Sequence, residues 1–481
     1  MFQKGLRARL YDSLREQPEP FFFLENTNIP AASIWTGSRL WNSYFKSLNF
    51  NDQTIIAINA TGSSAFLFIL TAALHSGIPM LLLPANASQQ DFEAELHSEN
   101  VVAGIYISDT LLIDEHFLPS IITVRADGHP PEPSKSLRFN SSTRLPAGAA
   151  IWLRSSGTSG SSKLIGLSES NILSVIDSHF PEGEIQASES WLSILPWHHC
   201  FGLVLELLPA LLHKVYLLRA FQLAKDPLEI LKLVGDSGID RLNMVPLTAV
   251  KISELERGRQ LLKNLKGGIV GGAAIPDSIV EFFQKTLVRI GYGQTQASPG
   301  IMLSKKGEFS SCLMGLPVGC EVKIKDGELF FKGNNSALFE EHDGKIVRFC
   351  TDQWRATDDL CELKNGQYYF RGRKDGNLKM LNGRMLQVFS IEHSLKQKLK
   401  SEYVLVTSFD GTRISICCED TVSLLQQSDF KEFIQKERVF YPAELRFYSR
   451  SEFLFNAKGE LKRSLTTQNL ALKNAKRVIQ L

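Results

Sequence analysis

The chain has 481 residues, of which 43% are hydrophobic, so it is long enough for one large domain and a smaller one. Its 53 Lys and Arg residues balance 51 Asp and Glu residues, and the formal charge of +2 excludes a strong field for nucleic acid or an anionic membrane. Seven cysteines without a C-x-x-C pair argue against a disulfide framework and a zinc site, and favour a reducing cytoplasm. Small-molecule partners are therefore expected.

The N-terminal stretch, residues 1–16, alternates Arg and Lys with apolar residues and lacks the continuous apolar core of a signal peptide. It predicts an amphipathic helix. The most apolar stretch, residues 65–83, is interrupted by the segment HSGIP. This pattern predicts a helix over residues 64–75 and a buried strand over residues 80–83, and no membrane span is expected.

Strand-like and helix-like runs alternate through the first half of the chain. Strand-like runs occupy residues 54–58, 101–107 and 149–153, and a further helix-like run occupies residues 227–237. This alternation predicts an α/β fold with layers of parallel sheet. The Pro- and Ser-rich residues 129–144 are expected to form a surface connection.

A domain boundary is predicted near residues 373–376. The sequence after this point forms a piece of about one hundred residues, which is domain-sized, with its own strand-like runs at residues 402–407 and 413–417. We therefore expect a large domain over residues 1–373 and a small domain over residues 374–481.

The loop at residues 154–163 (RSSGTSGSSK) follows a strand-like run and has the composition of a phosphate cradle. Glycines let backbone N–H groups turn toward an anion, hydroxyls add donors, and Lys163 supplies a point charge. A polyphosphate nucleotide is the ligand that this pattern favours. The competing interpretation is a flexible Gly/Ser surface loop, and Lys163 does not directly follow a glycine as the P-loop rule requires.

Further blocks follow in order: residues 195–202 (LPWHHCFG), 270–276 (VGGAAIP), 291–296 (GYGQTQ), 315–319 (GLPVG), 327–333 (GELFFKG), 354–360 (WRATDDL) and 372–375 (GRKD). Together with the loop at residues 154–163, they resemble the AMP-forming adenylating superfamily of acyl-CoA synthetases, peptide-synthetase adenylation domains and luciferases. The resemblance covers nearly the whole chain. Each block alone is weak, but their order and spacing are specific.

The resemblance implies a large N-terminal α/β domain of layered parallel sheets with helices, and a small mobile C-terminal α+β domain that acts as a lid. The hinge would lie at residues 373–376. It also implies a reaction in two steps, in which a carboxylate attacks the α-phosphate of ATP to give acyl-AMP and pyrophosphate, and a thiol then displaces AMP. The protein would mostly position groups and neutralise developing charge.

The resemblance further implies roles for individual residues. The β- and γ-phosphates would be held by Ser155, Ser156, Gly157, Thr158, Ser159, Gly160 and Lys163. The adenine side of the site would be formed by Gly271, Gly272, Ala273, Tyr292, Gly293 and Gln294. Thr295 would donate to the α-phosphate, Asp359 would accept the ribose hydroxyls with help from Arg373, and Thr158 and Gln296 would contact magnesium. Each has an ordinary alternative: Asp359 as a solvated turn residue, Tyr292 as core packing and Arg373 as a surface charge.

His199 matches the block whose histidine gates the acyl pocket in carboxylate-activating members of the superfamily. Alone, such a histidine is more often structural. Trp197, His198 and His199 stand where peptide-synthetase domains carry a Phe-Asp pair, which disfavours an amino-acid substrate. The flanking leucines suit a fatty or aryl acid, although core packing explains them equally well.

Two departures from the family pattern bear on activity. Gln296 replaces a glutamate that helps to hold magnesium, so metal affinity should fall. Glu460 occupies the position of the adenylation lysine, where a carboxylate would repel the α-phosphate. Lys458 and Lys462 lie two residues to either side and are candidates to substitute as catalytic residues, although both are also typical of a solvated surface.

The sequence therefore predicts an AMP-forming acid:thiol ligase that uses ATP and magnesium on a hydrophobic carboxylic acid. Its thiol acceptor would be CoA or the phosphopantetheine of an acyl-carrier protein. The alternative is a catalytically weakened homologue that binds ATP or acyl-AMP, or performs only the thiol-transfer step. Gln296 and Glu460 favour this alternative, whereas Lys163, Thr295 and Asp359 favour the enzyme.

Overall fold

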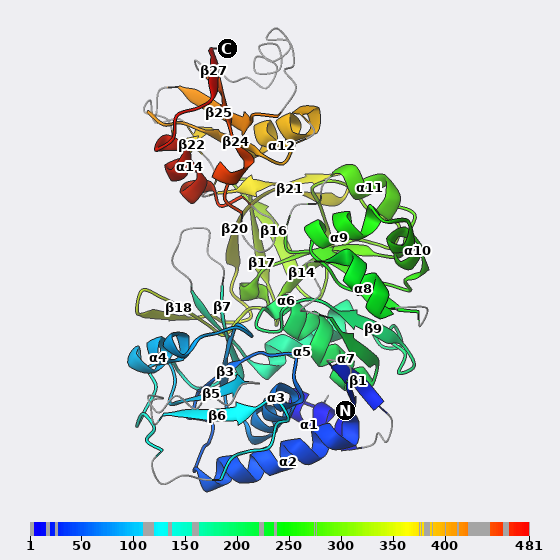
Figure 1. Cartoon of the computed structure of the whole chain (residues 1–481), viewed down its shortest axis with the longest axis vertical. Coiled ribbons are helices and arrows are strands. Elements are labelled where there is room, and N and C mark those ends of the chain that lie inside the picture. The colour runs from blue at the N-terminus through cyan, green and yellow to red at the C-terminus, as the bar shows by residue number, and fades with distance from the viewer. Residues whose placement is uncertain are drawn as a thin grey trace.

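The computed structural model arranges the chain as three large sheets with helices, and a smaller sheet at the C-terminal end (Figure 1). It describes residues 4–15, 20–24, 27–108, 120–132, 137–155, 163–220, 226–234, 238–273, 275, 277–374, 376, 378–379, 385–386, 388–399, 401–410, 413–421, 443–455 and 461–480. Among these residues, no helix is both long and apolar enough to cross a membrane.

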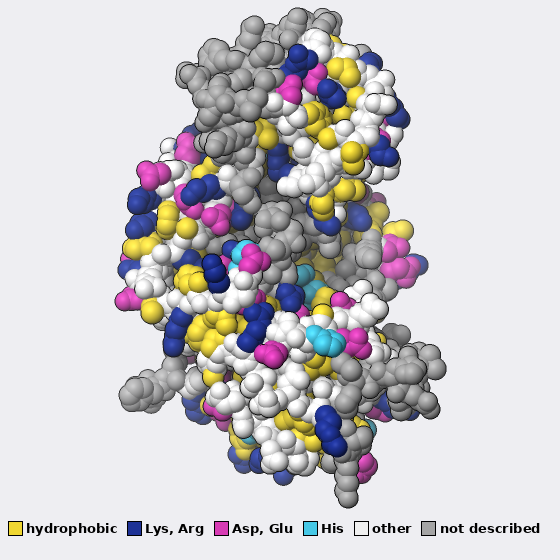
Figure 2. Space-filling model, turned by 90° about the vertical axis from the view of Figure 1, so that its left-hand side faces the viewer, with side chains coloured by type: hydrophobic (Ala, Val, Ile, Leu, Met, Phe, Trp, Pro, Cys, Tyr) yellow, Lys and Arg dark blue, Asp and Glu magenta, His cyan; other side chains and the backbone are white. Residues whose placement is uncertain are grey.

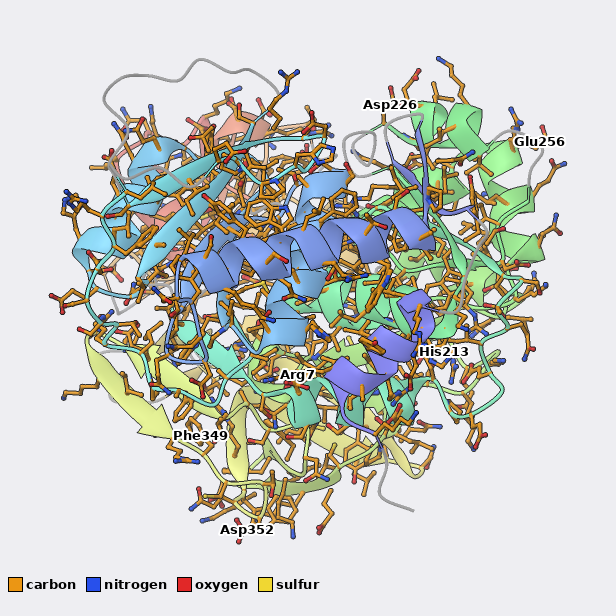
Figure 3. The ribbon with its side chains drawn as sticks, turned by 90° about the horizontal axis from the view of Figure 1, so that it is seen from below. Arg7, His213, Asp226, Glu256, Phe349 and Asp352 are labelled. Carbon is orange, nitrogen blue, oxygen red and sulfur yellow. The ribbon has the colours of Figure 1, made fainter. Side chains whose placement is uncertain are left out.

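The first sheet contains the N-terminal strands. Its order is β11 (Arg241–Leu242), β9 (Ser190–Ser193), β10 (Tyr216–Arg219), β1 (Pro20–Leu24) and β2 (Thr27–Pro30). All neighbours are parallel except β1 and β2, which form a hairpin. Figure 3 shows α2 (Ala31–Ser47) crossing the base of the molecule with α1 (Leu6–Arg15) beside it. The apolar face of α1 is buried through Leu6, Leu10 and Leu14, as the amphipathic pattern predicts.

The second sheet has the order β19 (Lys345–Arg348), β18 (Phe339–His342), β8 (Leu164–Leu167), β7 (Ile151–Arg154), β4 (Met80–Leu83), β3 (Ile56–Asn59), β5 (Ala103–Ser108) and β6 (Ile121–Arg125). The five strands from β7 to β6 are parallel, and β8, β18 and β19 continue the sheet in antiparallel pairs. The predicted strands at residues 54–58, 80–83, 101–107 and 149–153 all lie here.

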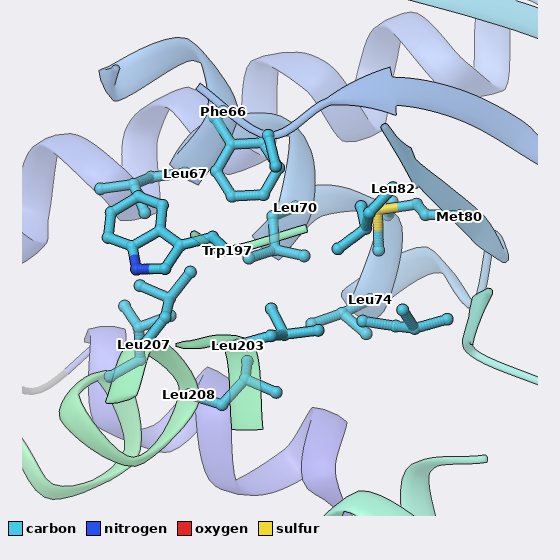
Figure 4. Packing of buried hydrophobic residues seen from close by; sticks show 14 of the residues in the cluster. Phe66, Leu67, Leu70, Leu74, Met80, Leu82, Trp197, Leu203, Leu207 and Leu208 are labelled. Atoms are coloured by element: carbon cyan, nitrogen blue, oxygen red, sulfur yellow. The ribbon is translucent and has the colours of Figure 1, made fainter. Parts of the chain in front are cut away.

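Helix α3 (Ser64–Ser76) forms because an apolar run is bounded by good end residues. The Ser63 side chain accepts a hydrogen bond from the backbone N–H of Phe66, and Gly77 ends the helix in the left-handed conformation. Every residue from Ala65 to Leu74 is buried, so the helix is apolar on all sides and lies in the core. Figure 4 shows α3 packed against Trp197, Leu203, Leu207 and Leu208.

The third sheet has the order β12 (Ile269–Gly271), β13 (Arg289–Gly293), β14 (Gly300–Leu303), β15 (Leu313–Pro317), β21 (Gln367–Arg373), β20 (Arg355–Lys364), β17 (Glu328–Lys332) and β16 (Glu321–Lys325). Only β12 and β13 are parallel, so this sheet departs from the expected parallel layers. Asp326-Gly327 and Asn365-Gly366 connect two of its hairpins, with both residues of each pair at positive φ. This conformation joins antiparallel strands tightly.

The remaining helices of the large domain are short. They are α4 (Gln89–His97), α5 (Glu169–His179), α6 (Cys200–Gly202), the π-helix η1 (Leu203–Leu207), α7 (Leu208–His213), α8 (Pro227–Val234), α9 (Pro246–Ser253), α10 (Glu256–Asn264), α11 (Asp277–Phe283) and the 3₁₀ helix η3 (Thr295–Ala297). Helices α8 to α11 share a buried apolar cluster with strands of the first and third sheets. The predicted helix at residues 227–237 corresponds to α8, and residues 235–237 lie outside the described residues.

The small domain contains a four-stranded sheet, in the order β24 (Val404–Thr407), β25 (Ile414–Glu419), β26 (Ala443–Tyr448) and β27 (Arg477–Gln480). A two-stranded sheet, β22 (Leu378–Lys379) with β23 (Met385–Leu386), precedes it, and α12 (Val388–Leu399), the 3₁₀ helix η4 (Arg450–Glu452) and α14 (Arg463–Ala471) complete it. The domain has its own apolar cluster. A large α/β domain followed by a small α+β domain is the predicted fold class.

Candidate active site

Asp359 is a buried carboxylate on the third sheet that contacts two partly exposed polar side chains. The hydroxyl of Tyr292 donates a hydrogen bond of 2.6 Å to its Oδ2 atom, and Nη1 of Arg373 lies 3.0 Å from Oδ1. Asp359 and Arg373 face each other because the β20–β21 hairpin pairs these two residues directly. The structure therefore brings together the three residues predicted to surround the ribose and adenine.

Burial dominates the electrostatics of this group. Asp359 is only 5% exposed, and the loss of hydration raises the pKa of its carboxyl group to about 6, although Arg373 and the Tyr292 hydroxyl act in the opposite direction. The pKa of Tyr292 is raised well above 10 by its own burial and by the neighbouring Asp359. Tyr292 therefore stays a hydrogen-bond donor, and Asp359 is an acceptor that ionises just below neutral pH.

The predicted adenine wall lies at the carboxyl ends of two adjacent parallel strands. Gly271 ends β12 opposite Gly291 of β13, and Tyr292 and Gly293 follow on β13. A side chain at Gly293 would overlap the carbonyl of Pro299, so only glycine fits there. Gly272 is exposed with φ of +87°, and Ala273 beside it is half-buried. The carboxyl edge of parallel strands is where α/β sheets commonly bind nucleotides.

The predicted phosphate loop is the connection of the β7–β8 hairpin. The N–H of Ser155 donates to the carbonyl of Lys163 at 2.9 Å, and the N–H of Lys163 donates to Oγ of Ser155 at 3.3 Å. These bonds close the base of the loop. The candidates Ser156, Gly157, Thr158, Ser159 and Gly160 lie outside the described residues.

The Lys163 side chain is paired with a residue that the sequence analysis did not identify. Its Nζ atom lies 2.7 Å from Oε1 of Glu340, and Arg355 pairs with the other carboxylate oxygen. Burial alone would raise the pKa of Glu340, but these two cations hold it below its usual value. Glu340 reaches Lys163 because β18 pairs with β8, a long-range contact without a local sequence signal.

Thr295 begins the 3₁₀ helix η3, directly after Gln294, which follows the end of β13. Its hydroxyl accepts a hydrogen bond of 3.5 Å from the Sγ atom of Cys200. The structure thus places Thr295 beside the block that contains His199. Gln296 is half-buried, and its backbone carbonyl accepts from the N–H of Ala337 at 2.9 Å.

His199 immediately precedes α6, and its ring lies 4.3 Å from that of His198, measured between ring centroids. Burial and the nearby charge of Arg219 lower the pKa of His198 to about 4. The flanking Leu203, Leu205, Leu207 and Leu208 are buried in the main apolar cluster. Core packing is therefore the explanation that the structure supports for these leucines, whereas Phe201 remains partly exposed.

Lys462 is an exposed residue of the small domain that directly precedes α14. Its backbone N–H donates to the carbonyl of Leu454 at 2.7 Å, and Phe455 bridges Leu461 in antiparallel fashion. Among the described residues, its ammonium group makes no hydrogen bond or ion pair with another side chain. Lys458 and Glu460 lie outside the described residues.

The small domain contacts the large domain beside Arg373. The rings of Phe370 on β21 and Phe389 on α12 meet edge to face, with centroids 4.9 Å apart. The His393 ring lies 3.3 Å from Oγ of Ser311, and the Gln397 amide donates to Asp277 of α11.

In Figure 2, basic and acidic side chains are interspersed over the visible face, in keeping with the small net charge.

In this α/β fold, the tyrosine near the carboxyl end of the parallel strand β13 thus contacts a buried carboxylate that is itself paired with an arginine on the antiparallel β20–β21 hairpin. The chain belongs to the family of AMP-binding enzymes, whose model matches residues 39–336. The match spans well over half of the chain. It agrees with the resemblance drawn from the sequence blocks.

Two individual proteins of similar sequence are named CoA ligases. A 3-[(3aS,4S,7aS)-7a-methyl-1,5-dioxo-octahydro-1H-inden-4-yl]propanoyl:CoA ligase of Rhodococcus jostii is 27% identical over 226 residues, which are 44% of this chain and 43% of that protein. The 4-coumarate–CoA ligase-like protein 8 of Arabidopsis thaliana is 25% identical over 248 residues, 46% of this chain and 44% of that protein. The chain therefore matches less than half the length of these curated relatives.

Solved structures resemble the fold over almost the whole chain. The anthranilate CoA ligase AuaEII in complex with anthranoyl-AMP gives a TM-score of 0.77 at 14% identity, covering 98% of both chains. The o-succinylbenzoate CoA synthetase of Bacillus subtilis with its acyl-adenylate intermediate gives 0.75 at 17% identity, covering 96% of this chain and 98% of that one. At these identities, the likeness establishes the fold.

Proposed function

We propose that the protein is an AMP-forming acid:thiol ligase. The carboxylate of a hydrophobic acid attacks the α-phosphate of ATP, forming an acyl-phosphate bond and releasing pyrophosphate. A thiolate then attacks the acyl carbon, forming a thioester and releasing AMP. The names of the relatives, which include CoA ligases and a ligase bound to an acyl-AMP, support this reaction class.

The buried group around Asp359 is the observation that carries the proposal. A carboxylate of raised pKa accepts two hydroxyl donors well, and the two ribose hydroxyls of ATP are such donors. Arg373 would orient the carboxylate, and Tyr292, which donates to Asp359, would stack near adenine beside Gly271, Gly272 and Ala273. Gly293 and Gln294 complete the adenine side of the site.

The triphosphate would lie along the loop that Ser155 and Lys163 close. Ser156, Gly157, Thr158, Ser159 and Gly160 would contribute backbone and hydroxyl donors, and Thr295 would donate to the α-phosphate. Magnesium needs oxygen ligands, which Gln296 and Thr158 supply in neutral form. The metal would therefore depend mainly on the phosphate oxygens of ATP, and it would neutralise charge on them.

The small domain would supply the cation for the α-phosphate during adenylation. Glu460 stands at the family's lysine position, so we assign this role to Lys462 or Lys458. Lys462 is exposed, and among the described residues its ammonium group makes no ion pair that would compete for it. This role requires a domain boundary, which we propose between residues 373 and 374.

The acid would bind beside His199, since Cys200 links this block to Thr295. We propose a fatty or aryl acid as substrate, a place in fatty acid metabolism, and CoA or a carrier-protein phosphopantetheine as acceptor. A long-chain-fatty-acid–CoA ligase 5 and the structure of McyG A-PCP complexed with phenylalanyl-adenylate are among the similar proteins. All seven cysteines are free thiols in the structure, which favours a reducing cytoplasm.

The test is pyrophosphate release from ATP over a panel of fatty and aryl acids, followed by thioester detection with CoA or a carrier protein. We expect at least one acid to give pyrophosphate, and Asp359→Ala to abolish most of that release. Pyrophosphate release that is independent of added acid, or that survives Asp359→Ala, contradicts the proposal.

The second candidate is a weakened homologue that binds ATP or acyl-AMP, or performs only the thiol-transfer step. Glu460 and Gln296 favour it, since both replace residues that serve adenylation. Synthetic acyl-AMP separates the candidates. Thioester formed from supplied acyl-AMP, without pyrophosphate release from any acid and ATP, supports this second function.

A further inference from the structure

A buried charged cluster lies directly behind the block that contains His199. It consists of Ser193, Trp197, Glu206 and Arg219, and we call it the Glu206–Arg219 cluster. The Ser193 hydroxyl donates to Oε2 of Glu206 at 2.6 Å and accepts from Nη1 of Arg219 at 2.7 Å and from the indole N–H of Trp197 at 3.2 Å. The guanidinium also lies 4.0 Å from the centre of the Trp197 ring.

The cluster is almost completely removed from water. The side chains of Arg219 and Glu206 are 3% and 1% exposed, and Nη1 of Arg219 lies 3.7 Å from Oε2 of Glu206. Burial raises the pKa of Glu206 to about 7 and lowers that of Arg219 to about 9. Buried ion pairs are often no more stabilising than apolar side chains of the same size, so stability alone does not explain this pair.

The position of the cluster offers an explanation. Ser193 ends β9 and is paired with Arg219, which ends the parallel neighbour β10. Glu206 lies in the π-helix η1, after the block at residues 195–202. The cluster therefore holds the segment from residue 193 to residue 206 at both of its ends, and π-helical insertions are frequently found at functional sites.

The segment itself has little freedom between these ends. Arg219 donates a second hydrogen bond, of 2.7 Å, to the carbonyl of Leu195. A side chain at Gly202 would lie 2.5 Å from the carbonyl of Pro196, so the chain doubles back closely. Trp197 is stacked on Phe66 of α3, with centroids 5.8 Å apart. Arg219 and Glu206 thus hold the segment that contains His199 through contacts on both sides of it.

We propose that Glu206 and Arg219 are positioning residues that fix the block of His199 and Cys200 beside Thr295 and thereby determine which carboxylic acids fit the site. This proposal rests on the acid-binding role proposed above. The sequence carries a signal for it that the motif analysis did not use. Glu206 is the one acidic residue in the apolar run of residues 200–213, and an unpaired charge would not be buried there.

A second buried ion pair, next to the start of β9, provides a matched control. Glu189 precedes β9 and pairs with Arg241, the first residue of β11, with Nε and Oε2 2.7 Å apart. Both side chains are buried, and Glu189 also accepts from the indole N–H of Trp191 at 2.9 Å. This pair has the same chemistry but lies at the amino end of the first sheet, away from His199.

The experiment measures two quantities for each chain: the melting temperature, and the calorimetric affinity for AMP and for benzoyl, octanoyl and palmitoyl sulfamoyl adenosine. The variants are Arg219→Met, Glu206→Met, both together, Arg219→Lys, and the control pair Glu189→Met with Arg241→Met. Single apolar changes should lower the melting temperature because each leaves a buried charge unpaired. The double change should recover much of that loss.

We expect the affinity ratios among the three acyl compounds to change about tenfold or more in the double variant, a typical scale for altered pocket contacts, while AMP affinity stays within about twofold. Arg219→Lys should give an intermediate change. The control pair should change stability in the same way as the double change of Glu206 and Arg219 but keep the native ratios. The positioning role is overturned if the affinity ratios are native in both Arg219→Lys and the double variant. It is also overturned if the ratios change in the single variants and return to native in the double variant together with the melting temperature. A native chain that binds no acyl compound more tightly than AMP instead contradicts the proposed function.

Discussion

At Asp359, the proposed binding of the ribose hydroxyls and the stability of the fold make opposite demands. The carboxylate must lose water to form part of a shaped site, and this burial raises its pKa to about 6 from 3.8. Below pH 3.8, the folded and unfolded chains both hold the proton. As the pH rises from there to 6, only the unfolded chain releases it, so the folded state loses stability and the loss is complete above pH 6.

Asp359→Asn should therefore separate the two properties. At pH 8 the variant should be more stable than the native chain, by up to about 3 kcal/mol on the scale of 1.36 kcal/mol per pH unit, and this gain should shrink toward pH 4.5. ATP binding should weaken by about 1.5 to 3 kcal/mol, because a neutral amide replaces a charge-assisted acceptor. Urea unfolding at both pH values and calorimetry with ATP measure these effects.

Glu362→Gln provides the control, because Glu362 lies on the same strand and forms an exposed pair with Arg371. It should change neither property appreciably. If the Asp359→Asn chain binds ATP with native affinity, Asp359 does not hold the ribose. If the stability that it gains over the native chain is smaller at pH 8 than at pH 4.5, burial does not raise the pKa of Asp359.

The sequence predicted some of this site and missed other parts for a physical reason. Tyr292 and Asp359 lie in recognisable blocks, so the resemblance predicted both, and the structure joins them by a hydrogen bond. Glu340 is 177 residues from Lys163 and contacts it only because β8 and β18 pair. Such a contact depends on strand register across the whole sheet, which no local pattern contains.

At the level of elements, β13 depends on its glycines. Gly293 lies where β13 and β14 approach so closely that an added methyl group would overlap the carbonyl of Pro299. We expect Gly293→Ala to destabilise the chain by about 1 to 3 kcal/mol, the usual scale for overpacking, and to weaken AMP binding because Tyr292 is the preceding residue. Thermal unfolding and AMP calorimetry measure both.

Gly5→Ala is a suitable comparison, because an added methyl group there contacts nothing within 4 Å. It should leave stability and AMP affinity close to native. If Gly293→Ala instead unfolds at the native temperature and binds AMP normally, the close approach of β13 to β14 does not shape the adenine side of the site.

The sequence predicted the type of an element correctly where the element's own residues determine it. The helix at residues 64–75 and the buried strand at residues 80–83 are confirmed, since both consist of continuous apolar runs with clear end residues. The antiparallel strand directions of the third sheet were harder to predict, because they are set by the connections between the strands. Asp326-Gly327 and Asn365-Gly366 were present in the sequence as hairpin signals, but strand alternation alone pointed to parallel layers.

At the scale of the whole molecule, adenylation would need the small domain to bring a cation to ATP in the large one. If a neighbouring lysine substitutes at present, Glu460→Lys should raise the rate of pyrophosphate release about tenfold or more, since a single donor to developing charge is commonly worth about 10²- to 10³-fold. Lys458→Ala and Lys462→Ala should lower the rate in the native background. Thioester formation from supplied acyl-AMP should change much less.

A double change of Lys458 and Lys462 to Ala that leaves brisk pyrophosphate release intact would disprove substitution by either lysine. Pyrophosphate that appears only after Glu460→Lys would favour the weakened homologue. The two results are distinguishable because the first requires an active native chain and the second an inactive one.

The place of β1 in the first sheet has a consequence for synthesis on the ribosome. Phe22 is fully buried and pairs with Leu217 of β10, a strand that is translated about 195 residues later. At about 5 to 20 residues per second, the apolar segment FFFL waits roughly 10 to 40 s for its partner strand. During that interval, β1 of a nascent chain can pair with β2 on one edge while its β10 edge stays open, and an open apolar strand edge is prone to aggregation.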